Sequence, residues 1–331
     1  RTERDRVEHW MANLPPLARS FEDADGKPFR HTFFYTAEEF RPALIERLSH
    51  LVERGFAETE IHLHHHNDTS EGFRHKLLEF VERLAERGLI GRDTETGRPR
   101  FAFIHGNWAL DNSRPDGRWC GVNDELRVLG ECGCFVDMTL PSAPSPTQTR
   151  RINSVYYAAD DPQRPRSHDD GTELRVGGRE SGDLMILQGP LGLSWPGGRF
   201  GILPRLETGE ISGGSPPTTT RARRWAQTGI CVAGRPEWIF VKLYTHGCQE
   251  RNWDALFGPD RYRLHEYLRE NYNDGKAWKL HYVTAREMYN IVKAAENGET
   301  GDPGNYRDYL VLPPARYAVS VSNSNHQEVA S

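Results

Sequence analysis

The most informative part of the sequence is Glu60-Ile-His-Leu-His-His-His-Asn-Asp-Thr69, where a short strand pattern runs into a group of histidines. Successive side chains of an extended strand point to opposite faces. We therefore expect Ile61 and Leu63 on one face and His62 and His64 on the other. Because parallel α/β sheets and barrels build their sites at the carboxyl ends of strands, the end of this strand is the first candidate for function.

The loop that leaves this strand adds His65, His66 and Asp68. Neutral imidazoles together with a carboxylate suit Zn2+, Fe2+, Mn2+, Co2+ or Ni2+. The density of histidines indicates a divalent metal site, with Zn2+ first among the candidates. The alternative is a polar surface loop with hydrogen-bonded histidines. Which of these imidazoles bind the ion stays open from the residues alone.

Strand and helix patterns alternate on both sides of this segment. Strand patterns cover residues 31–35, 59–63, 100–105 and 134–140, and helical patterns cover 7–21, 37–54, 71–87 and 124–132. Further strands are expected at 184–188, 238–244 and 281–283, and a last helix at 286–296. Alternation of this kind indicates parallel βα units, so the predicted fold class is α/β.

The middle of the chain interrupts this alternation. Residues 141–217 are rich in Pro, Gly, Ser and Arg and show no strong helical period. Long loops in a compact fold are usually functional or elaborate an interface. We therefore expect one domain over residues 1–313 with a loop-rich insertion at about 141–235, followed by a polar tail at 314–331.

Composition excludes several classes of protein. The chain has 331 residues, of which 37% are hydrophobic and 27% charged, which is typical of a soluble globular protein. Its net charge is −5, from 42 basic and 47 acidic residues, which argues against a general binder of nucleic acid or of anionic membranes. It has no apolar run long enough for a membrane span. Five cysteines, an odd number without zinc-finger spacing, are interpreted as small buried thiols.

A second strand pattern ends in a polar loop at Phe103-Ile-His-Gly-Asn-Trp-Ala-Leu-Asp-Asn112. Gly106 lets the backbone approach another group closely, and Trp108 offers the flat face on which sugars stack. Side chains for hydrogen bonding to a substrate are Asn107, Asp111 and Asn112. The alternative is an ordinary strand end followed by an Asx turn.

A third strand pattern, 238–244, ends in Tyr244-Thr-His246. A histidine at such a position can bind a metal or act as a general acid with a near-neutral pKa. A lone histidine at the end of a strand is also common as a structural residue. Tyr244 is a further candidate for contact with a substrate.

The order of these segments resembles the polysaccharide deacetylase superfamily. His31-Thr-Phe-Phe34 is similar to the family's "ATFF" strand, and Glu60-Ile-His-Leu-His64 is similar to the "EIGxH" strand that begins its H-x-x-x-H metal motif. Leu126 to Pro141 resembles "L…GfxYDSSxxP", Val241 to His246 resembles the strand that ends in the catalytic histidine, and Tyr282 to Glu287 resembles the closing "f-x-T-l-x-E" helix entry. The resemblance covers residues 28–142 and 236–296, and it implies a distorted (β/α)7-type barrel.

The sequence departs from the family pattern at three places. The second metal histidine falls on Asp68, four residues after His64. His105-Gly-Asn107 replaces an arginine-containing strand end. The family's leading Thr-Phe-Asp-Asp strand, which supplies a metal aspartate and the general base, has no counterpart before His31 and is expected upstream of Arg1.

The resemblance implies a hydrolase that uses a metal ion to remove N- or O-acetyl groups from a carbohydrate or polysaccharide. The predicted metal ligands are His64 and Asp68, with help from His62 or His66. The ion would lower the pKa of a bound water and polarise the acyl carbonyl. His246 would protonate the leaving group, and Asp111 or Asp137 would replace the family's base. His105 and Asn107 would stabilise the oxyanion, and Trp108 would stack on the sugar.

Two other functions stay open at this stage. A glycoside hydrolase on a related barrel would need two carboxylates across a groove and no metal. Carboxylates available for that role are Glu60, Asp68, Asp111, Asp124 and Glu125. A non-catalytic carbohydrate-binding protein would keep the fold without turnover. The cellular location is equally open, because free cysteines favour the cytoplasm while a polysaccharide substrate favours the cell envelope.

Overall fold

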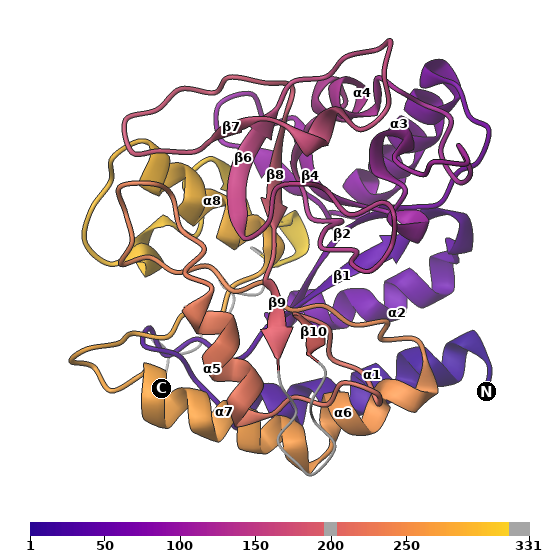
Figure 1. Ribbon diagram of the computed structural model, residues 1–331. Coiled ribbons are helices and arrows are strands. Elements are labelled where there is room, and N and C mark those ends of the chain that lie inside the picture. Colours follow the sequence, from indigo (N-terminus) through magenta and orange to yellow (C-terminus); the bar gives the residue numbers. More distant parts are fainter. Residues whose placement is uncertain (195–203, 318–331) are drawn as a thin grey trace.

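The computed structural model describes residues 1–194 and 204–317, and Figure 1 shows helices packed around a central twisted sheet. The helices are α1 (Glu3–Arg19), α2 (Pro42–Glu53), α3 (Ser70–Glu86), α4 (Glu125–Glu131), α5 (Thr219–Gln227), α6 (Trp253–Phe257), α7 (Pro259–Tyr272) and α8 (Ala285–Glu296). The strands are β1 (His31–Thr36), β2 (Ala57–Leu63), β3 (Gly91–Asp93), β4 (Pro99–His105), β5 (Cys134–Asp137), β6 (Ser154–Ala158), β7 (Thr172–Glu173), β8 (Leu184–Gln188), β9 (Leu191–Ser194), β10 (Arg205–Thr208) and β11 (Val311–Leu312).

The central sheet is largely parallel. Its strand order is β1-β2-β4-β5-β8-β6-β7, and β1, β2, β4, β5 and β8 pair in parallel. β6 and β7 continue it in antiparallel pairing, and β3 joins β4 to β11. The α/β class with parallel βα units is thereby confirmed. The ladders within residues 1–194 and 204–317 do not join β1 to β7, so closure into a (β/α)7-type barrel stays a prediction.

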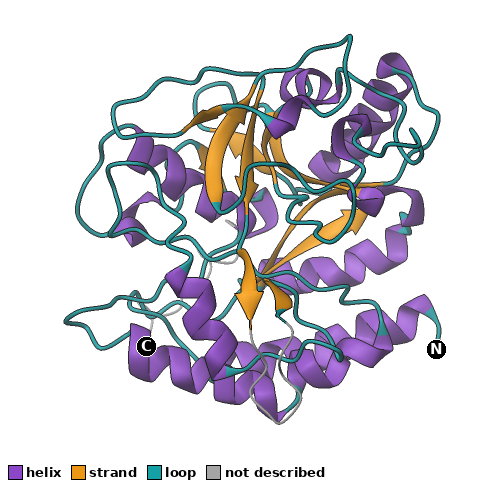
Figure 2. Cartoon of the chain, viewed as in Figure 1, coloured by secondary structure: helices purple, strands orange, loops and turns teal. Residues whose placement is uncertain are grey.

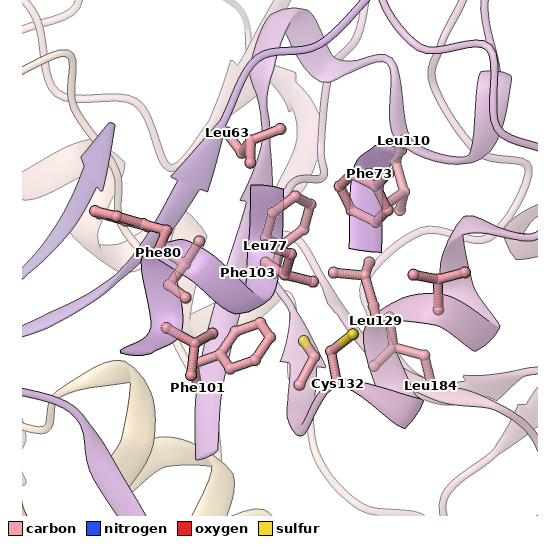
Figure 3. Close-up of a cluster of buried hydrophobic side chains, with 14 of the residues drawn as sticks. Leu63, Phe73, Leu77, Phe80, Phe101, Phe103, Leu110, Leu129, Cys132 and Leu184 are labelled. Atoms are coloured by element: carbon pink, nitrogen blue, oxygen red, sulfur yellow. The ribbon is translucent and has the colours of Figure 1, made fainter. Parts of the chain in front are cut away.

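One face of the sheet packs against α3 and α4. Apolar side chains of α3 recur at helical spacing, and Phe73, Leu77 and Phe80 are buried against the strands. Figure 3 shows these rings and aliphatic side chains beside Phe101 and Phe103 of β4. Burying a side chain of this size contributes about 1.5–3 kcal/mol, so this cluster holds the carboxyl ends of β2 and β4 in place.

The opposite face packs against α8, which is buried along its whole length. Thr284 and Glu287 form a capping box at its first turn, which satisfies backbone donors that the helix cannot pair internally. Helices α1, α5, α6 and α7 lie together at one end of the molecule (Figures 1 and 2). No helix of the described chain is both long and apolar enough to cross a membrane.

Two predicted strands are wrong. Residues 238–244 form a single bridge, from Tyr244 to Glu210, instead of a strand. β8 already pairs with β5 on one side and β6 on the other, so it offers this segment no free edge. It is held instead by the buried Lys242, whose ammonium donates to the carbonyl groups of Met138, Leu140 and Leu187. Residues 281–283 are also outside the sheet.

The middle region is more structured than its composition indicates. The strand at Leu184–Gln188 is confirmed, and β6 lies beside it in the same sheet. A hairpin of β9 and β10 and the helix α5 follow within the predicted insertion, 141–235. Of the predicted polar tail at 314–331, residues from 318 onward lie outside the described part of the chain.

Candidate metal centre

Strand alternation in β2 divides its histidines between two sides of the sheet. Ile61 and Leu63 are buried against α3, and His65 follows them on the same side, where its ring stacks on Phe73 with centroids 4.7 Å apart. His62 and His64 point the other way, and their ring centroids are 4.5 Å apart. The two sides have different surroundings and different chemistry.

On the buried side, His65 meets His105, Cys120 and Glu125. One ligand atom from each of the four lies within 4.8 Å of every other. His65 Nε2 is 3.0 Å and His105 Nε2 3.4 Å from Glu125 Oε1, and Cys120 Sγ is 3.4 Å from Glu125 Oε2. All four residues are buried, with 0–6% of their surface exposed. This group, the buried centre, could hold a metal ion.

Each member of the buried centre has an outer partner that orients it. His65 Nδ1 lies 3.5 Å from Asp68 Oδ2, and His105 Nδ1 lies 2.5 Å from the carbonyl oxygen of its neighbour Gly106. Carboxylates and carbonyls are the usual outer partners of metal-binding histidines. Both Nε2 atoms are thereby directed at the centre, and His105 Nε2 has no hydrogen-bond partner there.

Backbone amides support the other two ligands. Cys120 Sγ accepts hydrogen bonds from the backbone N–H groups of Asn112, at 3.3 Å, and Val122, at 3.4 Å. Glu125 Oε2 accepts one from the backbone N–H of Asp111, at 2.5 Å. Such donors stabilise negative charge on sulfur and oxygen, which is the form in which both bind a metal.

Burial decides the protonation of these groups in the absence of an ion. It lowers the pKa of His105 to about 4, so the imidazole is neutral at pH 7 and its lone pair is free to bind. Burial and the nearby Glu125 charge raise the pKa of the Cys120 thiol. For Glu125, burial opposes ionisation, but His105 and His65 outweigh it and hold the pKa of this carboxyl below its usual value.

A second layer of buried polar groups lies behind the centre. His168 Nδ1 is 3.5 Å from Asp111 Oδ2, and both ring nitrogens of His168 lack a hydrogen-bond partner although the residue is fully buried. The backbone N–H of Ser167 donates to the Asp111 carboxylate, and that of Arg166 donates to the Asp111 carbonyl at 2.9 Å. The segment around His168 is thereby attached to the loop that carries Cys120.

The opposite side of β2 carries a second, more exposed group. The backbone N–H of His64 donates to Glu38, whose Oε2 lies 3.7 Å from His64 Nδ1. His62 Nδ1 is 2.8 Å from the carbonyl oxygen of Ile104. His246 is exposed, and its ring centroid lies 6.0 Å from that of Trp108. We call Glu38, His62, His64, Trp108 and His246 the exposed group.

The predicted metal ligands have separate partners in the structure. His66 Nδ1 accepts a hydrogen bond from the backbone N–H of Trp119 at 2.9 Å. Asp68 pairs with Lys76 at 2.7 Å and faces His65. His62 and His64 lie together on the other side of the strand. Of the predicted site residues, only His105 belongs to the buried centre.

The other predicted residues have supporting positions. Asp137, at the end of β5, is buried and accepts hydrogen bonds from the amide and hydroxyl of Thr139 at 3.0 and 2.7 Å. Asn112 bonds Asn123 and Gly121 and so shapes the loop around Cys120. The Tyr244 hydroxyl lies 3.4 Å from Thr208 Oγ1. Asn107 is exposed beside Trp108.

The sequence pattern places His65 on the loop after the strand but does not single it out as a metal ligand. It indicates a buried thiol for Cys120, and it offers Glu125 only as a carboxylate for a glycoside hydrolase. Alternation continued by one more residue would have placed His65 on the same side as Leu63. The spacing from Cys120 to Glu125, at the start of a helix, was the other available signal. Comparison of the chain with protein-family models, with curated proteins and with solved structures finds no match in any of the three.

Proposed function

We propose that the chain is a metal-dependent hydrolase that removes N- or O-acyl groups from a carbohydrate. The observation that carries the proposal is the exposed group, which has imidazoles, a carboxylate and an indole beyond the carboxyl ends of β1, β2 and β4. It lies beside a buried centre that could hold a divalent ion. The segment order that resembles polysaccharide deacetylases supports the same reaction class. Zn2+ is the first candidate, with Co2+, Ni2+, Mn2+ and Fe2+ as others.

The exposed group supplies the residues for acyl transfer to water. Glu38 fixes the ring of His64 through its backbone and side chain, so His64 is the candidate that accepts the proton of the attacking water. His246 is exposed and is the candidate that protonates the leaving amine or alkoxide. Trp108, half-buried and next to His246, offers its face to a sugar ring.

The metal ion belongs to the buried centre in this proposal. His65, His105, Cys120 and Glu125 would hold it, since their donor set of two imidazoles, a thiolate and a carboxylate suits Zn2+. An ion with an open position supplies Lewis-acid polarisation of a carbonyl, whereas an ion with four protein ligands fixes the surrounding loops.

The test is release of acetate from a panel of N-acetylated and O-acetylated oligosaccharides. We expect turnover by the purified chain, and a loss of about 100-fold or more in His64→Ala and His246→Ala, the range for general acid–base groups. His75→Ala, an exposed histidine on α3, is the matched control and should turn over as the wild type does.

Three outcomes would overturn the proposal. Unchanged turnover in His64→Ala and His246→Ala would remove the exposed group from catalysis. Release of reducing ends in the presence of a chelator, without acetate, would assign a glycoside hydrolase instead. Binding of the oligosaccharides without release of any product would assign a carbohydrate-binding protein.

A further inference from the structure

We infer that the buried centre is a closed, structural Zn2+ site. The proposed hydrolase would depend on this ion for the shape of the loops beneath the exposed group, while the ion itself takes no part in the reaction. The inference rests on the proposed presence of an ion in this centre, but it does not need the proposed acyl hydrolysis. The ion would then have a structural role only, and the exposed group would carry out the reaction.

The spacing of the donor atoms fits four protein ligands around one ion. Zinc bonds of about 2.0–2.1 Å to nitrogen or oxygen and about 2.3 Å to sulfur place tetrahedral ligands roughly 3.3–3.6 Å apart. Glu125 Oε1 lies 3.0 Å from His65 Nε2 and 3.4 Å from His105 Nε2, Cys120 Sγ lies 3.4 Å from Glu125 Oε2, and one ligand atom from each of the four lies within 4.8 Å of every other. Four protein ligands around one ion would complete a tetrahedral shell, as in structural zinc sites, whereas catalytic sites keep one position for water or substrate.

Burial points to the same role. The side chains of His65, His105 and Glu125 are 0% exposed. Phe73 stacks on His65, and the second layer of Asp111 and His168 closes the centre from behind. A carbohydrate could not reach an ion here without displacing a ligand, whereas the exposed group on the other side of β2 is open to it.

The loop that joins His105 to Glu125 shows what the ion would stabilise. Among the described residues, several non-glycine positions in this loop have a left-handed backbone: Asn107, Trp108, Asp111, Asn112 and Trp119, with φ between 48° and 67°. Such conformations cost up to about 1–3 kcal/mol each for bulky residues and persist only when surrounding contacts enforce them. The loop has little regular structure beyond two short 3-10 turns, so ligands at both of its ends would enforce its shape.

The buried centre also connects the loop between His105 and Glu125 to the loop that follows β2. The backbone N–H of Asp68 donates to the carbonyl of Cys120 at 3.0 Å, and a Cβ on Gly121 would lie 2.8 Å from the Asp68 nitrogen. On the other side, a Cβ on Gly106 would lie 2.2 Å from the ring of His64. Two of the four buried ligands are therefore next in sequence to residues at the exposed group: His65 follows His64, and His105 precedes Gly106, which lies against the His64 ring.

The deciding experiment is absorption spectroscopy of the full chain loaded with Co2+ in place of Zn2+. We expect intense tetrahedral d–d bands and a thiolate-to-cobalt charge-transfer band. Both should stay unchanged when azide or acetate is added, because no coordination position is open. The charge-transfer band should vanish in Cys120→Ser and persist in Cys134→Ser, a buried cysteine of β5 that serves as the matched control.

The result separates the inference from the proposed function. Bands that shift with azide would show an open, catalytic position and would overturn the structural role. A charge-transfer band that survives in Cys120→Ser, or no cobalt binding at all, would overturn the site. If Cys120→Ser does not fold, the anion titration of the wild type still decides the question. Failure to release acetate, with these spectra as expected, would overturn the hydrolase proposal alone.

Discussion

The two ends of the parallel sheet both bury polar groups, but they do so in different ways. At the amino end, Arg30 precedes β1, Glu58 lies in β2, and Arg286 and Glu287 open α8. There, groups of opposite charge meet in pairs. At the carboxyl end, the buried centre gathers two imidazoles, a thiol and a carboxylate, and His105 Nε2 faces the others without a hydrogen bond.

The amino-end network pairs its arginines with carboxylates without any added group. Arg286 binds both oxygens of Glu58, at 3.0 and 2.8 Å, and Arg30 reaches Glu58 at 3.3 Å and also Glu287. Burial opposes ionisation of Glu287, but Arg30, Arg286 and Arg307 outweigh it and lower the pKa of this carboxyl. A buried cluster in which arginines already pair with carboxylates stabilises the fold. A buried cluster whose ligand atoms face one another without a cation between them fits a metal ion.

The largest expected effect is at the amino end. Arg286→Met leaves Glu58 buried without its main partner, so we expect the free energy of unfolding to fall by about 3–5 kcal/mol, with or without a chelator. Arg47→Met is the matched control, because it breaks an arginine–glutamate pair of similar length, 2.8 Å, on the exposed surface. That change should cost less than about 1 kcal/mol in urea unfolding. Equal losses in the two variants would contradict the role given to the buried network.

The carboxyl end should lose stability only when its ion is removed. Chelation of the wild type should lower the free energy of unfolding by about 3–4 kcal/mol, the stabilisation expected for a ligand at 100 to 1,000 times its Kd. Glu125→Gln should resemble the chelated wild type and should not respond to the chelator. A chelator effect of the same size in Glu125→Gln would show that the ion binds elsewhere.

A third contribution to the free energy of unfolding depends on pH and comes from His31, at the start of β1. Burial, and then the charge of Arg261, lowers the pKa of His31 to about 3 from 6.5. Below pH 6.5 this histidine binds a proton in the unfolded chain but not in the folded chain. The free energy of unfolding therefore falls as the pH drops from 6.5 towards 3. The slope from this residue is about 1.4 kcal/mol per pH unit.

His31→Leu should flatten the pH dependence by that amount, measured by urea unfolding of chelated samples at pH 6.5 and 4.5. His75→Leu, on the exposed surface of α3, is the control and should keep the wild-type slope. The same slope in His31→Leu as in the wild type would contradict the assignment to His31.

The smallest expected effect concerns the loop between β2 and α3. Thr69 caps α3 by accepting a hydrogen bond from the backbone N–H of Gly72 at 3.1 Å. Thr69→Ala should cost about 1 kcal/mol. Because Thr69 is not one of the four ligands of the buried centre, metal content should stay at the wild-type level in the same protein. Loss of the ion in Thr69→Ala would show that the helix cap and the centre are one unit.

The sequence predicted the parallel βα units because their signal is local. The alternation of Ile61, His62 and Leu63 and the helical spacing of Phe73, Leu77 and Phe80 are both set by neighbours in the chain. The strand pattern at 238–244 was wrong because a strand also needs a partner, and β8, which this segment contacts through Lys242, already pairs on both sides. No local pattern reports which edges are occupied.

The buried centre could be predicted only in part, since its ligands come from three segments. His65 and His105 end neighbouring parallel strands, so their proximity follows from the fold. Cys120 and Glu125 reach them only through the left-handed turns at Asp111 and Asn112, which sequence patterns do not specify. The family resemblance drew attention to His64 and Asp68 instead, on the other side of the strand and in the loop after it.

The most direct test of the central claim is the metal content of His65→Ala and His64→Ala, measured by inductively coupled plasma mass spectrometry beside the wild type. His64 and His65 are neighbours in the chain but lie on opposite sides of β2. We predict close to one equivalent of metal in the wild type and in His64→Ala, and its loss in His65→Ala, with the same loss in Glu125→Gln. Loss of the metal in His64→Ala with retention in His65→Ala would contradict the account, because it would place the ion in the exposed group.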